Sequence, residues 1–452
     1  MNTTDKQLMR SLKSRHIQMI AIGGAIGTGL FLGSGSAIKI SGPSIILSYL
    51  IVGIFCFFMM RSIGELLLSD ASKHSFLDFV KDYLGDKFEF ATGWMYWFCW
   101  ISLAMADLTA TGIYMKFWFN DLPQWIPPLT ILVALYITNK LKVRIFGELE
   151  SWFSIIKIAA ILILVVVGIT LAIFGFKANG QIASFNNLVA HGGFFATGGY
   201  GFLMSFQMVV FAFVGIEMVG LTAGETEQPE MNLPKAINSL PIRIGLFYIG
   251  SMIAIMSVCP WDKIDTSTSP FVQVFSSIGI PGAAGILNFV VLTAAFSATN
   301  SCLFSTSRTL YALGSGNNAP KSFSKLDKNG VPNISLNFST LFLMIIVILN
   351  FVMPANIFDL ISGVSTINFI IVWLVLIYCH VCYRRAQPSG VKAFKMPGYP
   401  TTDWLSLFFF ASILIFLFIN TSTRISMIIS GSVFILLLGI YQLYQKIRLL
   451  NN

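Results

Sequence analysis

Charged side chains are scarce in this chain of 452 residues, in which Asp, Glu, Lys and Arg together make up only 11%. Soluble domains typically carry about 25% charged residues. Hydrophobic residues account for 55% of the chain, and its mean hydropathy is +0.76. The composition therefore excludes an ordinary soluble protein and predicts an integral membrane protein.

Patterns for catalysis and nucleotide binding are missing as well. None of the 4 histidines has sequence neighbours at metal-ligand spacing, and no cluster of His, Cys or carboxylates has catalytic spacing. The phosphate-binding pattern Gly-x-x-x-x-Gly-Lys-Ser/Thr does not occur, so ATP-driven pumping is unsupported. We expect no enzymatic activity, no cofactor and no metal.

Cysteine is also sparse, and its 6 positions fall within or at the ends of apolar runs. A disulfide framework is not expected there. Cys379 and Cys382 have a redox or metal spacing, but they end an apolar run and no second pair accompanies them. We assign them no functional role.

Long apolar runs dominate what remains, and most reach the ~20 residues that a membrane-spanning helix needs. They lie at roughly 17–39, 43–68, 88–118, 126–139, 152–175, 200–223, 242–260, 281–311, 335–353, 357–382, 404–420 and 427–446. We expect an all-α polytopic membrane protein of 12 transmembrane helices without a soluble domain. Residues 1–16 are a polar, basic tail with no cleavable signal peptide.

The net charge of +9 follows from the orientation that these runs imply. If the N-terminus is inside, most Lys and Arg residues lie in inner connections. The outer connections hold only Lys39, Lys116, Lys177, Lys263 and Arg424. The positive-inside rule then places both termini in the cytoplasm, and no nucleic-acid partner is needed to explain the charge.

The first apolar run is interrupted by four glycines within residues 23–29. Glycine weakens a helix by about 1 kcal/mol per position relative to alanine. In hydrocarbon, each freed backbone group must find another partner. Unwound backbone is tolerated at that depth where it lines a site, so the pattern is typical of transporters.

A second interruption, residues 214–217, lies in the sixth run. Two broken helices five spans apart predict an inverted repeat of five helices, with residues 17–175 facing residues 200–383. The last two spans, residues 404–446, fall outside this repeat. The site is expected where the two breaks meet.

The break in the first span suits a carboxylate. Its outer half is expected to begin near Leu30, which places a positive helix N-terminus at membrane depth. The free amides of Thr28, Gly29 and Leu30 would then bind an anion.

The break in the sixth span offers the opposite polarity. The outer half of the sixth span is expected to end near Phe213 and to leave the carbonyls of Phe211 to Val214 unpaired. Together with the carbonyl of Ala25, these carbonyls suit an ammonium. A carboxylate and an ammonium one carbon apart define an α-amino acid. The alternative is that the glycines only allow close packing of helices.

Two acidic residues lie deep in apolar runs. Glu217 sits beside the second break, where a charge costs at least about 2.5 kcal/mol, so a protonation or ligand role is the default hypothesis. A protonated packing residue is the alternative. Asp107, in the middle of the third span, would either line the pathway or hydrogen-bond a broken helix.

Lys157 lies in the fifth span, about one and a half turns from its inner end. It would either snorkel to the inner surface or hold its ammonium against the inner half of the first span and shed a proton during transport. Arg61 and Glu65 have the i,i+4 spacing of a local ion pair.

Taken together, these segments resemble the bacterial amino acid permeases of the amino acid–polyamine–organocation superfamily. The likeness runs from about residue 10 to residue 385, and beyond that only the hydrophobic pattern matches. The matching motifs are residues 15–31, 213–217, 225–229, 234–236, 319–321 and 330–332. Residues 64–69, 96–100 and 236–243 are most similar to the D-serine/D-alanine/glycine permeases, with aromatic amino acid permeases second.

This resemblance implies the leucine-transporter fold and alternating access. Carried over by motif, Thr28 and Gly29 would bind the substrate carboxylate. The carbonyls of Ala25, Phe211 and Val214 would bind its ammonium. The implied substrates are small neutral amino acids: D-alanine, D-serine, glycine and L-alanine.

For coupling, the resemblance implies proton symport across the bacterial plasma membrane. Glu217 stands where the family has a proton-responsive acid, and Lys157 where relatives have their coupling lysine. Sodium coupling is the rival. From another class, a channel is disfavoured because one chain with two asymmetric breaks lacks a symmetric ring of like groups. The sequence does not indicate an oligomeric state.

Overall fold

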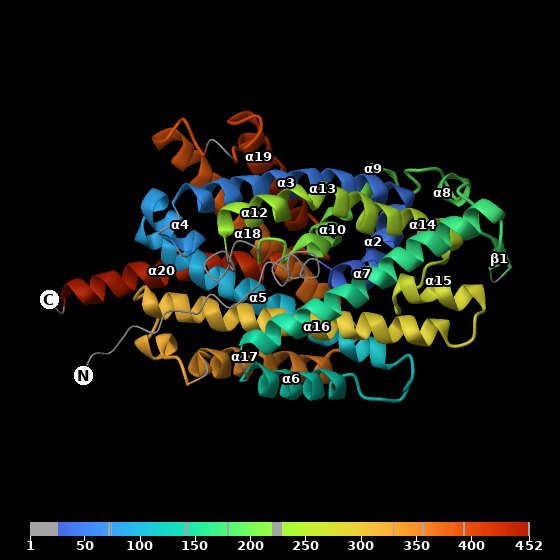
Figure 1. Ribbon diagram of the computed structural model, residues 1–452, viewed down its shortest axis with the longest axis horizontal. Coiled ribbons are helices and arrows are strands. Elements are labelled where there is room, and N and C mark those ends of the chain that lie inside the picture. The colour runs from blue at the N-terminus through green and yellow to red at the C-terminus, as the bar shows by residue number, and fades with distance from the viewer. Residues whose placement is uncertain are drawn as a thin grey trace.

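The computed structural model describes residues 26–70, 73, 75–140, 143–178, 180–218, 228–328, 330–354, 357–391 and 394–450. These residues form a bundle of mostly long helices (Figure 1). Within them, β structure amounts to one hairpin of two-residue strands. Ala25 and residues 219–227 lie outside the described residues, and so does the expected N-terminal tail.

Nine helical segments among the described residues are long and apolar enough to cross a membrane, and the first of them, Gly29–Ser69, contains two of the expected spans. Two shorter apolar helices, Ile126–Asn139 and Gly198–Phe213, match the fourth and sixth runs. The described part of each of the twelve apolar runs therefore contains helix, and the prediction of an all-α polytopic membrane protein is confirmed.

The first half of the chain carries the elements up to the second break. They are η1 (Gly29–Gly33), α2 (Ser34–Ser41), η2 (Gly42–Ser44), α3 (Ile45–Ser69), α4 (Phe76–Leu84), α5 (Asp86–Met115), α6 (Ile126–Asn139), α7 (Val143–Phe174), β1 (Lys177–Ala178), β2 (Gln181–Ile182), α8 (Asn187–Ala190), α9 (Gly198–Met204) and α10 (Phe206–Phe213). The strands pair antiparallel, with Lys177 opposite Ile182.

The second half is helical in all its described elements. They are α12 (Pro229–Asn238), α13 (Leu240–Arg243), η4 (Ile244–Ile249), α14 (Gly250–Val258), η5 (Trp261–Lys263), α15 (Pro270–Ile278), α16 (Ala283–Ser315), η6 (Lys321–Ser324), α17 (Asn333–Val352), α18 (Ile357–Ala386), α19 (Thr401–Ile419) and α20 (Arg424–Leu450).

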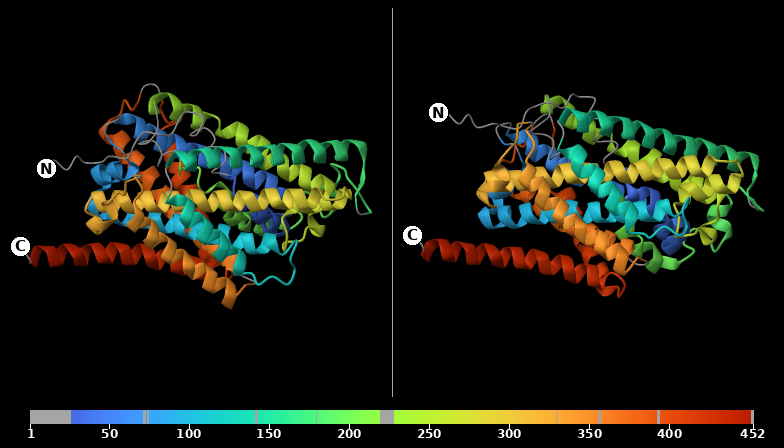
Figure 2. Two further views of the ribbon diagram at one scale, coloured as in Figure 1. Left: turned by 60° about the horizontal axis from the view of Figure 1, so that its bottom comes forward. Right: turned by 90° about the horizontal axis from the view of Figure 1, so that it is seen from below.

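Helix α5 forms the centre of the bundle. It packs most extensively against α16 and then against α18, and 83% of its most apolar segment is buried, compared with 17% for α20. Figure 2 shows α20 along the outside, with its last turns extending past the neighbouring helices. The deepest positions are therefore those on α5, α16 and α18 that face one another.

The connections divide between the two ends of the bundle. Helix α4 and the carboxy-terminal end of α20 lie at one end, and α8 and the β hairpin at the other (Figure 1). Ser75 and Asp78 form a capping box that starts α4, and Gly85, at φ 87°, turns the chain into α5. This arrangement agrees with the alternation of inner and outer connections that the sequence predicts.

Candidate functional site

The sixth span is broken where the sequence predicts. Helix α10 ends at Phe213, and Val214 leaves it with φ −59° and ψ 143°. Gly215 follows at φ 94°, a conformation that glycine adopts without steric cost. The expected break at residues 214–217 is therefore confirmed.

The first helix of the described residues begins at Gly29, close to the expected start near Leu30. A tight turn precedes it, in which the Gly27 carbonyl accepts hydrogen bonds from the amides of Leu30 at 3.2 Å and Phe31 at 3.3 Å. In this conformation the Leu30 amide is thus already paired, contrary to our expectation. The amides of Thr28 and Gly29 are the first of the helix, where intrahelical partners run out.

The two breaks lie against each other. A Cβ atom added to Gly29 would be 2.7 Å from the Ala212 Cα and 2.9 Å from the Phe211 carbonyl oxygen. One turn further, a Cβ on Gly33 would be 2.7 Å from the Met208 sulfur. The glycines therefore do allow close helix packing, and this packing brings the start of η1 against the end of α10.

The carbonyls at the end of α10 are partly occupied. The Tyr248 hydroxyl donates to the Ala212 carbonyl at 3.2 Å. The Phe211 carbonyl accepts from the Val214 amide at 3.3 Å within a turn. An incoming ammonium would share or replace these donors.

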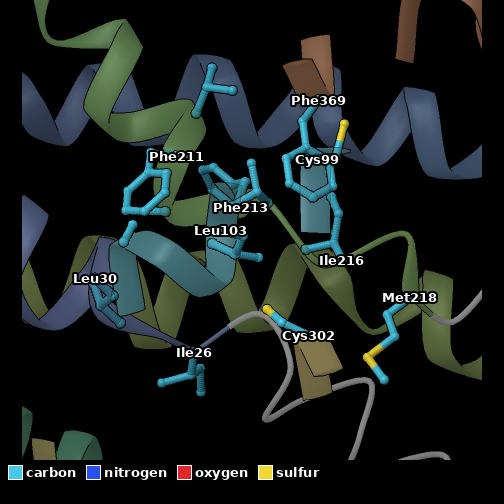
Figure 3. Close-up of a cluster of buried hydrophobic side chains, with 14 of the residues drawn as sticks. Ile26, Leu30, Cys99, Leu103, Phe211, Phe213, Ile216, Met218, Cys302 and Phe369 are labelled. Carbon is cyan, nitrogen blue, oxygen red and sulfur yellow. The ribbon is translucent and has the colours of Figure 1, made fainter. Parts of the chain in front are cut away.

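Apolar side chains close over both breaks. Thr28 and Glu217 are each only 1% exposed. Figure 3 shows a cluster of buried hydrophobic side chains that includes residues of both breaks, and its labelled members are Ile26, Leu30, Cys99, Leu103, Phe211, Phe213, Ile216, Met218, Cys302 and Phe369. The cavity that Ile26, Phe213 and Ile216 line has a volume of about 10 Å³, roughly the room for one water molecule. Among the described residues, apolar side chains therefore cover the two breaks.

Asp107 binds the first break directly. Its Oδ1 accepts a hydrogen bond of 2.6 Å from the Thr28 hydroxyl, and both residues are buried. The Cys302 thiol lies 4.0 Å from Oδ2. Of the two roles considered for Asp107, the geometry favours hydrogen bonding to a broken helix.

Glu217 lies directly after the second break and is buried among side chains of several helices. The indole N–H of Trp373 and the backbone amide of Gly215 face its carboxyl. Within the described part of the chain, however, neither carboxylate oxygen has a partner at hydrogen-bond geometry. Glu217 is therefore a buried acid whose protonation no strong local contact fixes.

Lys157 is fully buried, with 0% of its side chain exposed. Its ammonium donates to the Ser297 hydroxyl at 3.1 Å and lies 3.8 Å from Glu150 Oε1. Snorkelling to the surface is therefore wrong for this conformation. The expected contact with the inner half of the first span involves residues outside the described ones.

Glu150 is the site residue that sequence reasoning missed. It is also 0% exposed and accepts a hydrogen bond of 2.8 Å from Ser297. It precedes Lys157 by seven residues, or two turns of α7, so the two side chains share one face of the helix. This seven-residue spacing is the sequence signal that could have identified Glu150 as a partner of Lys157.

Arg61 and Glu65 do not form the expected local ion pair. Glu65 instead accepts from Arg384 at 2.7 Å and lies 3.1 Å from His380 Nε2. The other ring nitrogen of His380 is 2.7 Å from Asp403 Oδ2. Arg61 donates to an asparagine side chain of α12. These long-range contacts connect α3, α18 and α19.

A bundle of helices long enough to span a membrane, in which a helix break after Phe213 lies against the start of η1 beside buried ionisable groups, is typical of a transporter rather than an enzyme. The family model described as amino acid permease matches residues 16–452. The chain therefore belongs to the amino acid permease family. The match also extends past residue 385, where we expected the likeness to end.

Relatives agree with this assignment over nearly their whole length. The chain is 55% identical over 443 residues to the amino-acid permease AapA of Bacillus subtilis, covering 98% of this chain and 96% of the relative. It is 46% identical to the D-serine/D-alanine/glycine transporter of Escherichia coli K12, covering 96% and 93%. It is 43% identical to a probable threonine/serine transporter of Bacillus subtilis, covering 96% and 95%.

Proposed function

We propose that this protein imports small neutral amino acids, namely glycine, D-alanine, D-serine and L-alanine, by proton symport and alternating access. The observation that carries the proposal is the contact between Gly29 and the end of α10, which sets peptide groups of opposite polarity side by side. The 46% identity to a D-serine/D-alanine/glycine transporter supports the substrate class. The membrane is the bacterial plasma membrane, with both termini cytoplasmic.

In this proposal the amides of Thr28 and Gly29 bind the substrate carboxylate. The carbonyls of Phe211 and Val214 bind the ammonium together with that of Ala25. Because Thr28 and Glu217 are buried in this conformation, the helices on either side of the breaks must separate before substrate enters. The repeats 17–175 and 200–383 are the units proposed to move against each other.

Glu217 is proposed as the acid whose protonation accompanies substrate. It is buried and lacks a strong partner among the described residues, so its charge state can follow the conformation around it. Lys157 is proposed as the second coupling group, because its ammonium is fully buried beside Ser297 and Glu150.

The test is uptake of labelled glycine into proteoliposomes that contain the purified protein. We expect accumulation that a protonophore abolishes and that replacing sodium leaves unchanged. Uptake that requires sodium would overturn the coupling. Unlabelled D-serine, L-alanine, L-threonine, L-phenylalanine and L-lysine then compete with glycine. Inhibition by phenylalanine alone would favour an aromatic amino acid permease, and inhibition by threonine alone a threonine carrier.

A further inference from the structure

The partners of Lys157 form a continuous hydrogen-bonded path. The ammonium of Lys157 donates to the Ser297 hydroxyl at 3.1 Å. The same hydroxyl donates to Glu150 Oε1 at 2.8 Å. Lys157 and Glu150 lie on α7 and Ser297 on α16, and the side chains of Lys157 and Glu150 are fully buried. A serine hydroxyl can accept one hydrogen bond while donating another, so Ser297 connects a donor to an acceptor.

Among the described residues, few other titratable groups interact with Lys157 and Glu150. Asp107 on α5 interacts electrostatically with Lys157, and the Cys302 thiol on α16 interacts with Glu150. Helix α14, which packs along α7, carries no titratable side chain between Gly250 and Val258. Removing one member of a buried ion pair leaves an uncompensated charge, which is strongly unfavourable. If the Lys157 ammonium lost its proton to water, the buried Glu150 carboxylate would be left without a compensating positive charge.

We propose that Ser297 and Glu150 form a proton relay for Lys157, in which Glu150 is the temporary acceptor. One ammonium proton passes to the Ser297 oxygen as the Ser297 hydroxyl proton passes to Glu150 Oε1. Lys157 becomes a neutral amine, Glu150 a neutral carboxylic acid, and Ser297 is regenerated. The pair has the same total charge before and after, so no proton has to leave the protein at this step.

This inference rests on the proposed function, because it assumes that Lys157 takes part in coupling. To that function the relay adds the group that accepts the Lys157 proton, which is Glu150. The buried ammonium charge of Lys157 can be neutralised without an open path to water. Glu150 and Ser297 are therefore positioning residues that act through Lys157 and do not touch the substrate.

The test uses two readouts on purified protein in proteoliposomes. Accumulation of labelled glycine under an imposed pH gradient requires proton coupling, whereas counterflow exchange of glycine requires no net proton movement. For Ser297→Ala we expect accumulation to fall about tenfold or more, with counterflow changed less than about twofold. Ser297→Thr keeps the hydroxyl and should restore accumulation. Ser301→Ala is the matched control, since its buried hydroxyl lies one turn along α16 and has no partner among the described residues.

Glu150→Gln removes the acceptor and should flatten the pH dependence of accumulation while counterflow remains. If this variant folds poorly, the double variant with Lys157→Met, which removes both charges, should recover folded protein and still fail to accumulate. Wild-type accumulation by Ser297→Ala, or equal losses in both readouts, would overturn the relay alone. Accumulation by the unmodified protein without a proton gradient would overturn the relay and the proposed function together.

Discussion

The Glu217 side chain shows what a single residue can do when the surrounding helices leave it without a firm partner. Neither carboxylate oxygen has hydrogen-bond geometry to a described residue. For Glu217→Gln we therefore expect little change in thermal stability, because the amide has nearly the same shape. Accumulation of glycine under a pH gradient should fall about tenfold or more, since the amide takes up no proton.

Glu230→Gln serves as the control for this change, because Glu230 is an exposed acid on α12. It should accumulate glycine like the unmodified protein. If Glu217→Gln did the same, Glu217 would be a packing residue. If instead it lost both accumulation and counterflow, its role would lie in binding and not in coupling.

At this scale the sequence indicated candidate site residues but not their contacts. Asp107, Lys157 and Glu217 stand out because each is a lone ionisable group in an apolar run. Glu150 does not stand out, because it lies near the start of its run and looks like part of a polar helix end. Its link to Lys157 through Ser297 depends on a residue about 140 positions away, which spacing cannot reveal.

At the breaks, the helical elements contact each other through backbone atoms, and their closest approach is at Gly29. In Gly29→Ala the new methyl would lie 2.7 Å from the Ala212 Cα. Such overpacking costs about 1–3 kcal/mol, and a backbone neighbour cannot rotate away. We expect a lower thermal midpoint of the purified protein and loss of both accumulation and counterflow.

Gly431→Ala on α20 is the control for that substitution, because a Cβ there meets nothing within 4 Å. Alanine also favours helix over glycine by about 1 kcal/mol. The control should therefore be at least as stable as the original. If Gly29→Ala retained normal transport, the breaks would have to lie further apart in the working protein than they do here.

The sequence predicted the break in the sixth span and the start of the first described helix near Leu30, because glycine density and a lone acid mark these positions. It did not predict that the Leu30 amide would pair with Gly27, since a turn of this kind depends on local backbone angles. It also left open whether the glycines serve packing or binding. The structure shows the packing directly.

On the scale of the whole molecule, Glu65 holds three helices and a connecting segment together. It accepts hydrogen bonds from Arg384 and from the amides of Val391 and Met396, and it lies against His380. Glu65→Gln would leave a buried Arg384 without its carboxylate. Breaking a buried pair in this way costs about 3–5 kcal/mol, so we expect a large drop in the thermal midpoint.

The comparison for this prediction is Asp86→Asn, which removes an ion pair of 3.6 Å between Asp86 and Lys81, both about half exposed. Exposed pairs contribute about 0–1 kcal/mol, so the midpoint should scarcely move. Equal effects of the two substitutions would contradict the structural role of Glu65.

The sequence suggested a local ion pair between Glu65 and Arg61 because i,i+4 spacing is visible along a helix, whereas His380 is 315 residues away from Glu65.

The contact between Gly29 and Ala212 has a consequence for how selectivity can change. It joins backbone groups that are proposed to bind the ammonium and carboxylate, and every α-amino acid carries these two groups. Randomising the apolar side chains around it, such as Leu103 and Phe369, should therefore yield carriers for new amino acids. A library that varies Gly29 should yield none.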